Sequence, residues 1–359
     1  MAAVDACRWS TLSIPSAPYV TSLPWISHYG CQYVVHGDDI TSDSNGEDCY
    51  RFVKAAGRFL VVKRTPGIST TDLVGRMLLC TRTHFIKSFT DVLEGKEGSG
   101  PEEEKVATGS GMLQRMCDYA TDETGLKPGP QVWIWLGSSS AKIHGGKAEP
   151  GSFTKMVPGV GPAPDQRIVY VDGGFDLFSS GHIEFLRQVY EQENGDAYIV
   201  AGVHDDNVIN HWKGLNYPIM NIYERGLCVL QCKYVSAVVF SAPFCPSKAF
   251  LQNIPFGKVS AAYHGPTAFM PLTYDSYGDA KEMGILKEIP SHIFERVNAG
   301  EIVERILKSR EAFAERQRKK GEKAVGEEVV RRREETEREE TEREVAESAR
   351  TRVQEQHLN

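Results

Sequence analysis

The sequence predicts an α/β protein whose core is a Rossmann-like, doubly wound parallel sheet. Between residues 167 and 263, short apolar segments rich in β-branched residues alternate with segments of helical periodicity. An internal repeat points the same way, because SAPYVTSLPWISHYGCQYVVHG at 16–37 returns as SAPFCPSKAFLQNIPFGKVSAAYHG at 241–265. A third observation is the glycine-rich turn DGGFDLFSSGH at 172–182, which joins a strand to a helix. We therefore expect two related α/β units.

The second unit is expected to contain four strands and three helices. The expected strands are 167–171, 197–203, 237–240 and 258–263, and the expected helices are 182–191, 223–234 and 246–253. In doubly wound sheets, ligands bind beyond the carboxyl ends of the strands. The turns that follow these strands should therefore line one crevice.

The first unit is less complete. Residues 16–79 supply two expected strands, 33–35 and 59–62, and helices around 50–55 and 71–79. Nothing in this unit corresponds to residues 167–240, so we expect a first domain without its N-terminal half. A biological truncation and an incomplete gene model explain this equally well.

Composition suggests the domain boundaries. We expect a partial first domain at 1–90, a linker at 91–165 rich in Gly, Pro and Glu, a second domain at 166–309, and a charged helical or disordered tail at 310–359. Within the linker, Trp133 and Trp135 are expected to be an apolar anchor packed on a domain. The tail has no apolar stripe, which argues against membrane binding.

Charge and cysteine usage narrow the class of protein. The 359 residues carry a formal net charge of -7, which gives no general attraction for nucleic acid. The eight cysteines form no CxxC pair, and no apolar stretch reaches the length of a membrane span. We expect a cytoplasmic protein with reduced cysteines, a small-molecule ligand and no nucleic-acid partner.

The turn at 172–182 has the features of a phosphate site. A helix N-terminus presents unpaired backbone N–H groups, glycines let an anion approach the backbone, and His182 adds a side-chain donor. Taken alone, the same turn is also compatible with an ordinary tight connection between a strand and a helix. The surrounding residues favour the phosphate site.

The chain resembles the nucleotidylyltransferase superfamily marked by a His-X-Gly-His turn, and most closely the ethanolamine-phosphate cytidylyltransferases, which carry two tandem cytidylyltransferase domains. The resemblance rests on YVDGGFDLFSSGHIEFL, on HWKGLNYPIMNIYERGLCVLQCKYVSAVV and, in the first unit, on VHGDDI and RTPGISTTDLVGRML. It covers residues 16–307 apart from the linker. Two departures stand out: Ser179 occupies the place of the first histidine, and the second unit has no Ser/Thr-rich partner to GISTTD.

The resemblance implies transfer of CMP from CTP to phosphoethanolamine, which yields CDP-ethanolamine and pyrophosphate for phosphatidylethanolamine synthesis, with Mg²⁺ on the triphosphate. It assigns catalytic roles to His182, Lys213 and Ser179. It also assigns contacts with CTP to a larger set of positions. In the second unit these are Gly174, Phe175, Asp176, Gly181, Arg225, His264 and Gly265. In the first unit they are His36, Gly37, Asp38, Arg64, Thr65, Gly67, Ser69, Thr70 and Thr71.

Several alternatives stay open at this point. Arg225 is either a phosphate contact or a structural partner of Glu224, and STTDL could be a helix N-cap as well as a phosphate clamp. Lys213 could be a solvated loop lysine. For the whole chain, the alternatives are a nucleotide-binding or scaffold relative without turnover, and adenylyl transfer to another acceptor. A homodimer is compatible with either.

Overall fold

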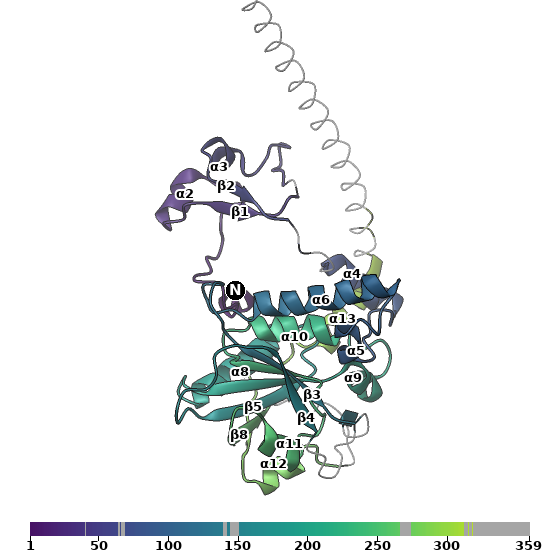
Figure 1. Ribbon diagram of the computed structural model, residues 1–359. Coiled ribbons are helices and arrows are strands. Elements are labelled where there is room, and N and C mark those ends of the chain that lie inside the picture. Colours follow the sequence, from purple (N-terminus) through teal and green to yellow (C-terminus); the bar gives the residue numbers. More distant parts are fainter. Residues whose placement is uncertain are drawn as a thin grey trace, which may run out of the picture. The chain divides into compact units, whose positions relative to one another are not determined.

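The structure is a computed structural model, and it describes residues 1–39, 41–63, 65, 69–138, 142–143, 151–265, 274–311, 315 and 318 (Figure 1). The chain divides into two compact units. The larger unit combines residues 1–15 with residues 72–308, and the smaller unit combines residues 16–71 with the chain after 308. Most of the expected tail at 310–359 lies outside the described residues.

The larger unit is built on a seven-stranded sheet of order β4-β3-β7-β6-β5-β8-β9. Every neighbouring pair is parallel except β3 with β4. The strands are β3 (Gln131–Leu136), β4 (Ser152–Val157), β5 (Ile168–Gly173), β6 (Tyr198–Val203), β7 (Ala237–Phe240), β8 (Val259–His264) and β9 (Leu286–Glu288). The predicted α/β fold with a doubly wound parallel sheet is confirmed, and all four expected strands are present.

The prediction of a linker at 91–165 is wrong for much of that range. Helix α6 (Glu102–Tyr119) and strands β3 and β4 belong to the larger unit, and β3 pairs with β7 in parallel. The described Gly- and Pro-rich stretches at 94–101 and 158–166 lie just before α6 and just after β4. Trp135 is 1% exposed, and its ring lies 5.4 Å from that of Phe250, so the expected apolar anchor is confirmed.

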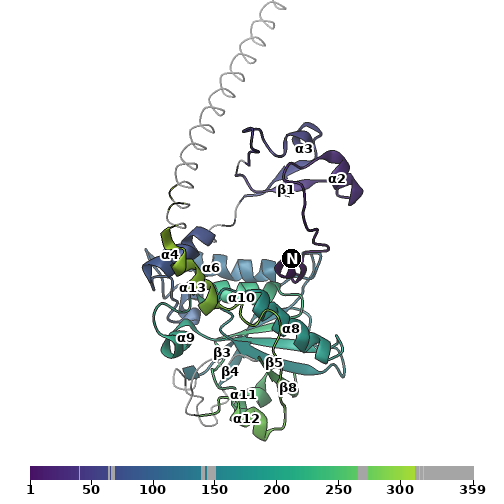
Figure 2. The ribbon, with the colours of Figure 1, turned by 180° about the vertical axis from the view of Figure 1, so that it is seen from behind.

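Helices cover both faces of this sheet (Figures 1 and 2). Helices α6, α8 (Ser180–Gln192) and α10 (Ile222–Gln231) lie on one face, while α11 (Lys248–Asn253) and α12 (Gly278–Glu282) lie on the opposite face. Other helices of this unit include α1 (Ala2–Asp5), α5 (Phe89–Leu93), α9 (Asp206–Lys213) and α13 (Ala299–Lys308). Because the central strands are covered twice, all six residues of β6 are buried.

The smaller unit contains a two-stranded parallel sheet. Strand β1 (Val34–His36) pairs with β2 (Phe59–Val61), and helices α2 (Leu23–His28) and α3 (Arg51–Ala55) accompany them. The expected strands and the helix around 50–55 are therefore present. Its buried apolar residues are few, with Ile26, Cys49 and Val53 among them.

Helix α4 (Thr70–Leu79) begins within the motif RTPGISTTD and belongs to the larger unit from Asp72 onward. Its Met77 is buried in a cluster with Leu177, Ile219 and Val303. The expected boundary at residue 90 is therefore placed too late, because packing already joins α4 to the larger unit. Among the described residues, no helix is both long and apolar enough to cross a membrane.

Candidate functional site

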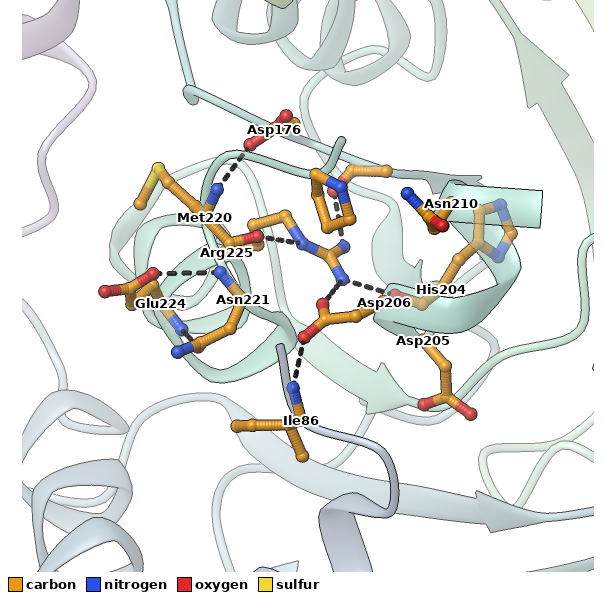
Figure 3. Close-up of polar contacts among 12 residues, drawn as sticks. Ile86, Asp176, His204, Asp205, Asp206, Asn210, Met220, Asn221, Glu224 and Arg225 are labelled. Carbon is orange, nitrogen blue, oxygen red and sulfur yellow. Dashed lines mark hydrogen bonds and ion pairs between the residues drawn. The ribbon is translucent and has the colours of Figure 1, made fainter. Parts of the chain in front are cut away.

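The turn after β5 holds two residues in a backbone conformation that L-amino acids rarely adopt. Phe175 has φ of 49° and Leu177 has φ of 48°, and neither is a glycine. Such residues cost about 1–3 kcal/mol each and persist only where surrounding contacts hold them. Asp176 supplies part of that hold, because its carboxylate accepts the amides of Ile219 at 2.8 Å and Met220 at 2.9 Å (Figure 3). The turn is therefore kept in a fixed, strained shape.

Arg225 lies beneath this turn and is fully buried. Its guanidinium donates to the carbonyls of Gly174 at 2.6 Å, His204 at 2.6 Å and Met220 at 3.0 Å, and it pairs with Asp206 at 2.8 Å (Figure 3). Burial raises the pKa of Asp206 to about 6, and the Arg225 charge works against that rise. Arg225 therefore joins the ends of β5 and β6 to α10.

This network answers the question left open for Arg225. Its donors are directed at protein oxygens inside the fold, so the expected phosphate contact is wrong. The alternative partner, Glu224, is wrong as well, since Glu224 pairs with Arg76 at 2.8 Å. Sequence reasoning could not find these partners because the acceptors lie 5 to 51 positions away along the chain.

His182 stands in the first turn of α8 and forms a capping box with Ser179, the residue before the helix. The backbone N–H of Ser179 donates to its Nδ1 at 3.2 Å, so Nδ1 is the acceptor and Nε2 carries the hydrogen. Burial, together with the nearby Lys213 charge, lowers the pKa of His182 to about 4. The ring of Phe178 stacks on it at 5.7 Å. His182 is thus a neutral, oriented N–H donor at neutral pH.

Ser179 is used differently from what the resemblance implies. Its hydroxyl donates to the carbonyl of Val297 at 2.6 Å, and this ties the start of α8 to the segment before α13. Gly181 is needed in the same place, because a Cβ there would lie 2.6 Å from the Val297 oxygen. The Ser179 hydroxyl is therefore committed to the protein, which leaves His182 as the donor of this turn.

Lys213 is the last residue of α9 and lies close enough to His182 and Asp176 to interact electrostatically with both. Burial lowers its pKa, and the Asp176 carboxylate counteracts part of that effect. Its ammonium is 5.4 Å from the centre of the Tyr217 ring. The structure therefore brings together His182, Lys213 and the turn at 174–181, as the sequence predicts.

Asp172 is a functional candidate that sequence reasoning did not single out. It lies near the carboxyl end of β5, and its Oδ1 accepts the hydroxyl of Tyr277. Its Oδ2 is buried beside the Tyr170 hydroxyl, and neither atom makes a hydrogen bond of normal geometry within the described residues. Burial raises the pKa of this carboxyl to about 7. The ring of His264, the last residue of β8, lies 4.8 Å from the ring of Tyr277. Through Tyr277, His264 is therefore close to Asp172 at the carboxyl ends of the strands.

A second group that sequence reasoning missed comes from the supposed linker. Lys142, between β3 and β4, pairs with Asp205 at 2.7 Å, and the Ser241 hydroxyl donates to the same carboxylate at 2.6 Å. Asp205 lies two residues after the end of β6, and Ser241 directly follows β7. The signal was present in the continuous apolar run of the QVWIWL segment, which precedes the loop that carries Lys142.

The residues expected in the first unit lie in the smaller unit. His36 ends β1, where its Nδ1 is 3.1 Å from the Gly37 carbonyl, and Asp38 follows. Thr65, Ser69, Thr70 and Thr71 are described, the last two within α4, whereas Arg64 and Gly67 lie outside the described residues. The structure does not bring this set together with the turn at 174–181 in one unit.

Within the described part of the chain, no group of three or more His, Cys, Asp or Glu side chains could hold a metal ion. Asp176, the carboxylate nearest the turn, is already occupied by two backbone amides. The described residues thus include no group of side chains that could enclose Mg²⁺. An ion carried by substrate phosphates would need few protein ligands.

Residues 1–76 and 170–299 match the cytidylyltransferase-like family. The chain is 36% identical over 324 residues to the ethanolamine-phosphate cytidylyltransferase of Mus musculus, an alignment that covers 89% of this chain and 76% of that protein. The chain belongs to the ethanolamine-phosphate cytidylyltransferase family. The Dictyostelium discoideum member is 35% identical, with 90% of this chain and 80% of that protein aligned.

Choline-phosphate cytidylyltransferase A of Homo sapiens is more distant. It is 30% identical over 154 residues, which cover 43% of this chain and 40% of that protein. The match to the ethanolamine-phosphate cytidylyltransferase family therefore extends over about twice as much of the chain. Within this family, the chain combines an oriented His182 and a nearby Lys213 with a serine at position 179.

Proposed function

We propose that this protein transfers CMP from CTP to phosphoethanolamine and releases CDP-ethanolamine and pyrophosphate, a step toward phosphatidylethanolamine. Family membership supports the reaction class. The observation that carries the proposal is the proximity of two cationic or N–H donors to the strained turn after β5. One is the neutral His182 in the first turn of α8, and the other is Lys213 at the end of α9. This is a ready site for a triphosphate.

The transfer needs no protein nucleophile. A phosphate oxygen of phosphoethanolamine attacks the α-phosphorus of CTP, and pyrophosphate leaves with the electron pair of the broken bond. The protein must align two anions and stabilise charge on the phosphoryl oxygens. His182 would donate through Nε2–H, and Lys213 would act as a point charge. Mg²⁺ would arrive on CTP and offset triphosphate charge.

Asp172 supports phosphoethanolamine as the acceptor. Its Oδ2 is buried at the carboxyl edge of the sheet without a hydrogen bond of normal geometry within the described residues, and a cationic group there would satisfy it. The raised pKa of this carboxyl means that a cation bound there would shift it toward its charged form. The ammonium of phosphoethanolamine is such a group, and we assign it to Asp172.

Several finer expectations belong to the same proposal. Arg64, Thr65, Ser69, Thr70 and Thr71 would clamp phosphate from the RTPGISTTD motif. We place the protein in the cytoplasm. A homodimer is the expected oligomer, and light scattering on the purified chain would measure it.

Ser179 favours a second candidate, nucleotide binding without turnover. A serine cannot carry charge as an imidazolium can, and its hydroxyl is already bonded to Val297. The turn would then bind CTP through His182 and Lys213 but stabilise the transition state less well.

Radiolabelled phosphoethanolamine with CTP and Mg²⁺ separates the two candidates. We expect labelled CDP-ethanolamine, and a loss of about 10²–10³ in rate for His182→Ala because one preorganised donor is removed. CTP binding without any product would support the second candidate. Absence of both product and CTP binding would rule out the two together.

A further inference from the structure

Side chains donate hydrogen bonds to most backbone carbonyls of the loop at 214–220, between α9 and α10. Six of its seven carbonyls accept a side-chain hydrogen bond. Asn210 serves the carbonyls of Gly214, Leu215 and Tyr217, at distances of 3.2, 3.1 and 2.7 Å. The other donors are His84 to Pro218 at 2.8 Å, Arg76 to Ile219 at 3.0 Å and Arg225 to Met220 at 3.0 Å. A loop satisfied in this way has one strongly preferred conformation.

Two of these donors come from residues 70–88, outside the second repeat unit. Arg76, on α4, also forms a two-pronged ion pair with Glu224, at 2.8 and 2.9 Å. Glu224 in turn accepts the backbone N–H of Asn221 at 2.8 Å, which caps the start of α10 (Figure 3). The carbonyl of Arg76 accepts from Asn216 at 2.8 Å. Helix α4 is therefore bonded to the loop in both directions.

The loop touches both halves of the candidate phosphate site. Lys213 immediately precedes it, and the amides of Ile219 and Met220 hold Asp176 in the strained turn. The cluster that buries Met77 of α4 also contains Leu177, from that turn, and Ile219, from the loop. A shift of α4 would thus displace the lysine and the turn together.

We propose that Arg76, through its pair with Glu224, is a positioning residue for the site formed by His182 and Lys213. Helix α4, which ends the first sequence repeat, would then determine how tightly the site in the second repeat binds the nucleotide. Arg76 does not itself contact the nucleotide. This inference rests on the proposed function, since it assumes that the site binds CTP.

The repeat supplies a matched control. The segment DLVGRML at 72–78 aligns with EIVERIL at 301–307, so Arg305 on α13 corresponds to Arg76 on α4, and it is exposed. Three variants test the pair: Arg76→Ala removes it, Arg76→Lys keeps the charge without the fork, and Glu224→Gln keeps the shape without the charge. Arg305→Ala is the control.

The measurement is calorimetric titration of the full chain with CTP and Mg²⁺, which reports both Kd and the fraction of binding-competent protein. We expect Arg76→Ala to raise Kd by about tenfold or more, because a displaced Lys213 weakens its contact with the phosphates, and one hydrogen bond to a charged group contributes about that factor. Arg76→Lys and Glu224→Gln should lie between this variant and the parent, and Arg305→Ala should match the parent. A merely structural role would lower the competent fraction and leave Kd unchanged.

The outcomes separate the two ideas. If the parent binds CTP and Arg76→Ala or Arg76→Lys binds it with the parent Kd, the positioning role is wrong and the proposed function stands. The positioning role is also wrong if Arg305→Ala weakens binding as much as Arg76→Ala. If the parent binds no CTP, the proposed function fails, and the positioning role fails with it.

Discussion

The strands of the larger and the smaller unit have similar sequences and different surroundings. In β6 every residue is buried, whereas in the β1–β2 pair Val35 is 56% exposed and Val61 is 59% exposed. Strand β6 and the β1–β2 pair are parallel to their neighbours, and both contain β-branched residues. The difference shows that such composition predicts a strand but not its burial, which depends on neighbouring strands and covering helices. The two units should therefore respond differently to the same substitution.

The largest expected difference comes from placing a charge in each sheet. Val200→Asp, in β6, puts an unpaired carboxylate in a fully buried site and should cost at least about 4 kcal/mol in unfolding free energy. Val61→Asp, in β2, should change it by no more than about 0.5 kcal/mol, as at an ordinary surface position. Urea unfolding followed by circular dichroism measures both. Equal losses would mean that the β1–β2 pair is covered as fully as β6.

Ion pairs sharpen the comparison. Arg225→Met leaves the buried Asp206 carboxyl and three buried carbonyls of the larger unit without their partner, so we expect a loss of about 3–5 kcal/mol in guanidinium unfolding. Arg51→Met removes a partner of Asp43 in the smaller unit, at 3.0 Å near solvent, and its effect should be too small to measure. A strong effect of Arg51→Met, or none of Arg225→Met, would contradict this assignment of the buried network.

The pKa values of two aspartates are shifted in opposite directions, so their contributions to the free energy of unfolding should depend on pH in different ways. Burial raises the pKa of Asp172 to about 7, above its unfolded value near 4, so the folded state binds more protons between those limits. The stability contributed by this group is present at low pH and is lost as pH rises through 7. Asp172→Asn should therefore become progressively more stable than the parent from pH 5 to pH 8.

The control for that experiment is Asp43. Hydrogen bonds from the Asn45 and Glu47 amides, with help from Arg51, lower its pKa. Its contribution is present above the unfolded pKa and is lost only as pH falls through the lowered one. The effect of Asp43→Asn should be constant from pH 5 to 8. If the difference in unfolding free energy between Asp172→Asn and the parent is constant over the same range, the pKa of Asp172 is not raised. The assignment of a bound ammonium to this carboxyl would then lose its support.

The smallest effect concerns helix starts. Ser179→Ala removes the bond to Val297 at the start of α8 and should cost about 1 kcal/mol. Ser22, the N-cap of α2 in the smaller unit, makes no side-chain capping bond. Ser22→Ala should therefore cost measurably less in thermal unfolding. A larger loss of stability in Ser22→Ala than in Ser179→Ala would contradict the hydrogen bonds assigned to the two hydroxyls.

The helices and strands could be predicted from the sequence where the periodicity of apolar residues matches the burial in the fold. The four expected strands of the second unit and the turn at 172–182 are present, because alternation of strands and helices is a strong signal. Strands β3 and β4 were hidden by the Gly- and Pro-rich segments around them, and β9 is only three residues long. A short edge strand carries too little periodicity to be recognised.

The site was predictable in part for a similar reason. His182 and Lys213 stand in recognisable motifs, and the structure brings them together. The partners of Arg225, the link from Arg76 to Glu224 and the arrival of Lys142 beside Asp205 depend on contacts between distant segments, which no local pattern encodes. The buried Oδ2 of Asp172, which lacks a hydrogen bond of normal geometry within the described residues, likewise becomes visible only once the packing around β5 is known.

The central claim is that the turn at the start of α8 binds the CTP triphosphate, and one pair of histidines tests it directly. His182 heads α8 in the larger unit, and His36 ends β1 in the smaller one. Calorimetric titration of the full chain with CTP and Mg²⁺ should show affinity reduced by about tenfold or more in His182→Ala, as expected for loss of a hydrogen bond to a charged group. The same titration should show affinity within about twofold of the parent in His36→Ala, because His36 lies in the smaller unit and the turn at the start of α8 lies in the larger one. Parent-like affinity in His182→Ala, with the loss in His36→Ala instead, would contradict the account.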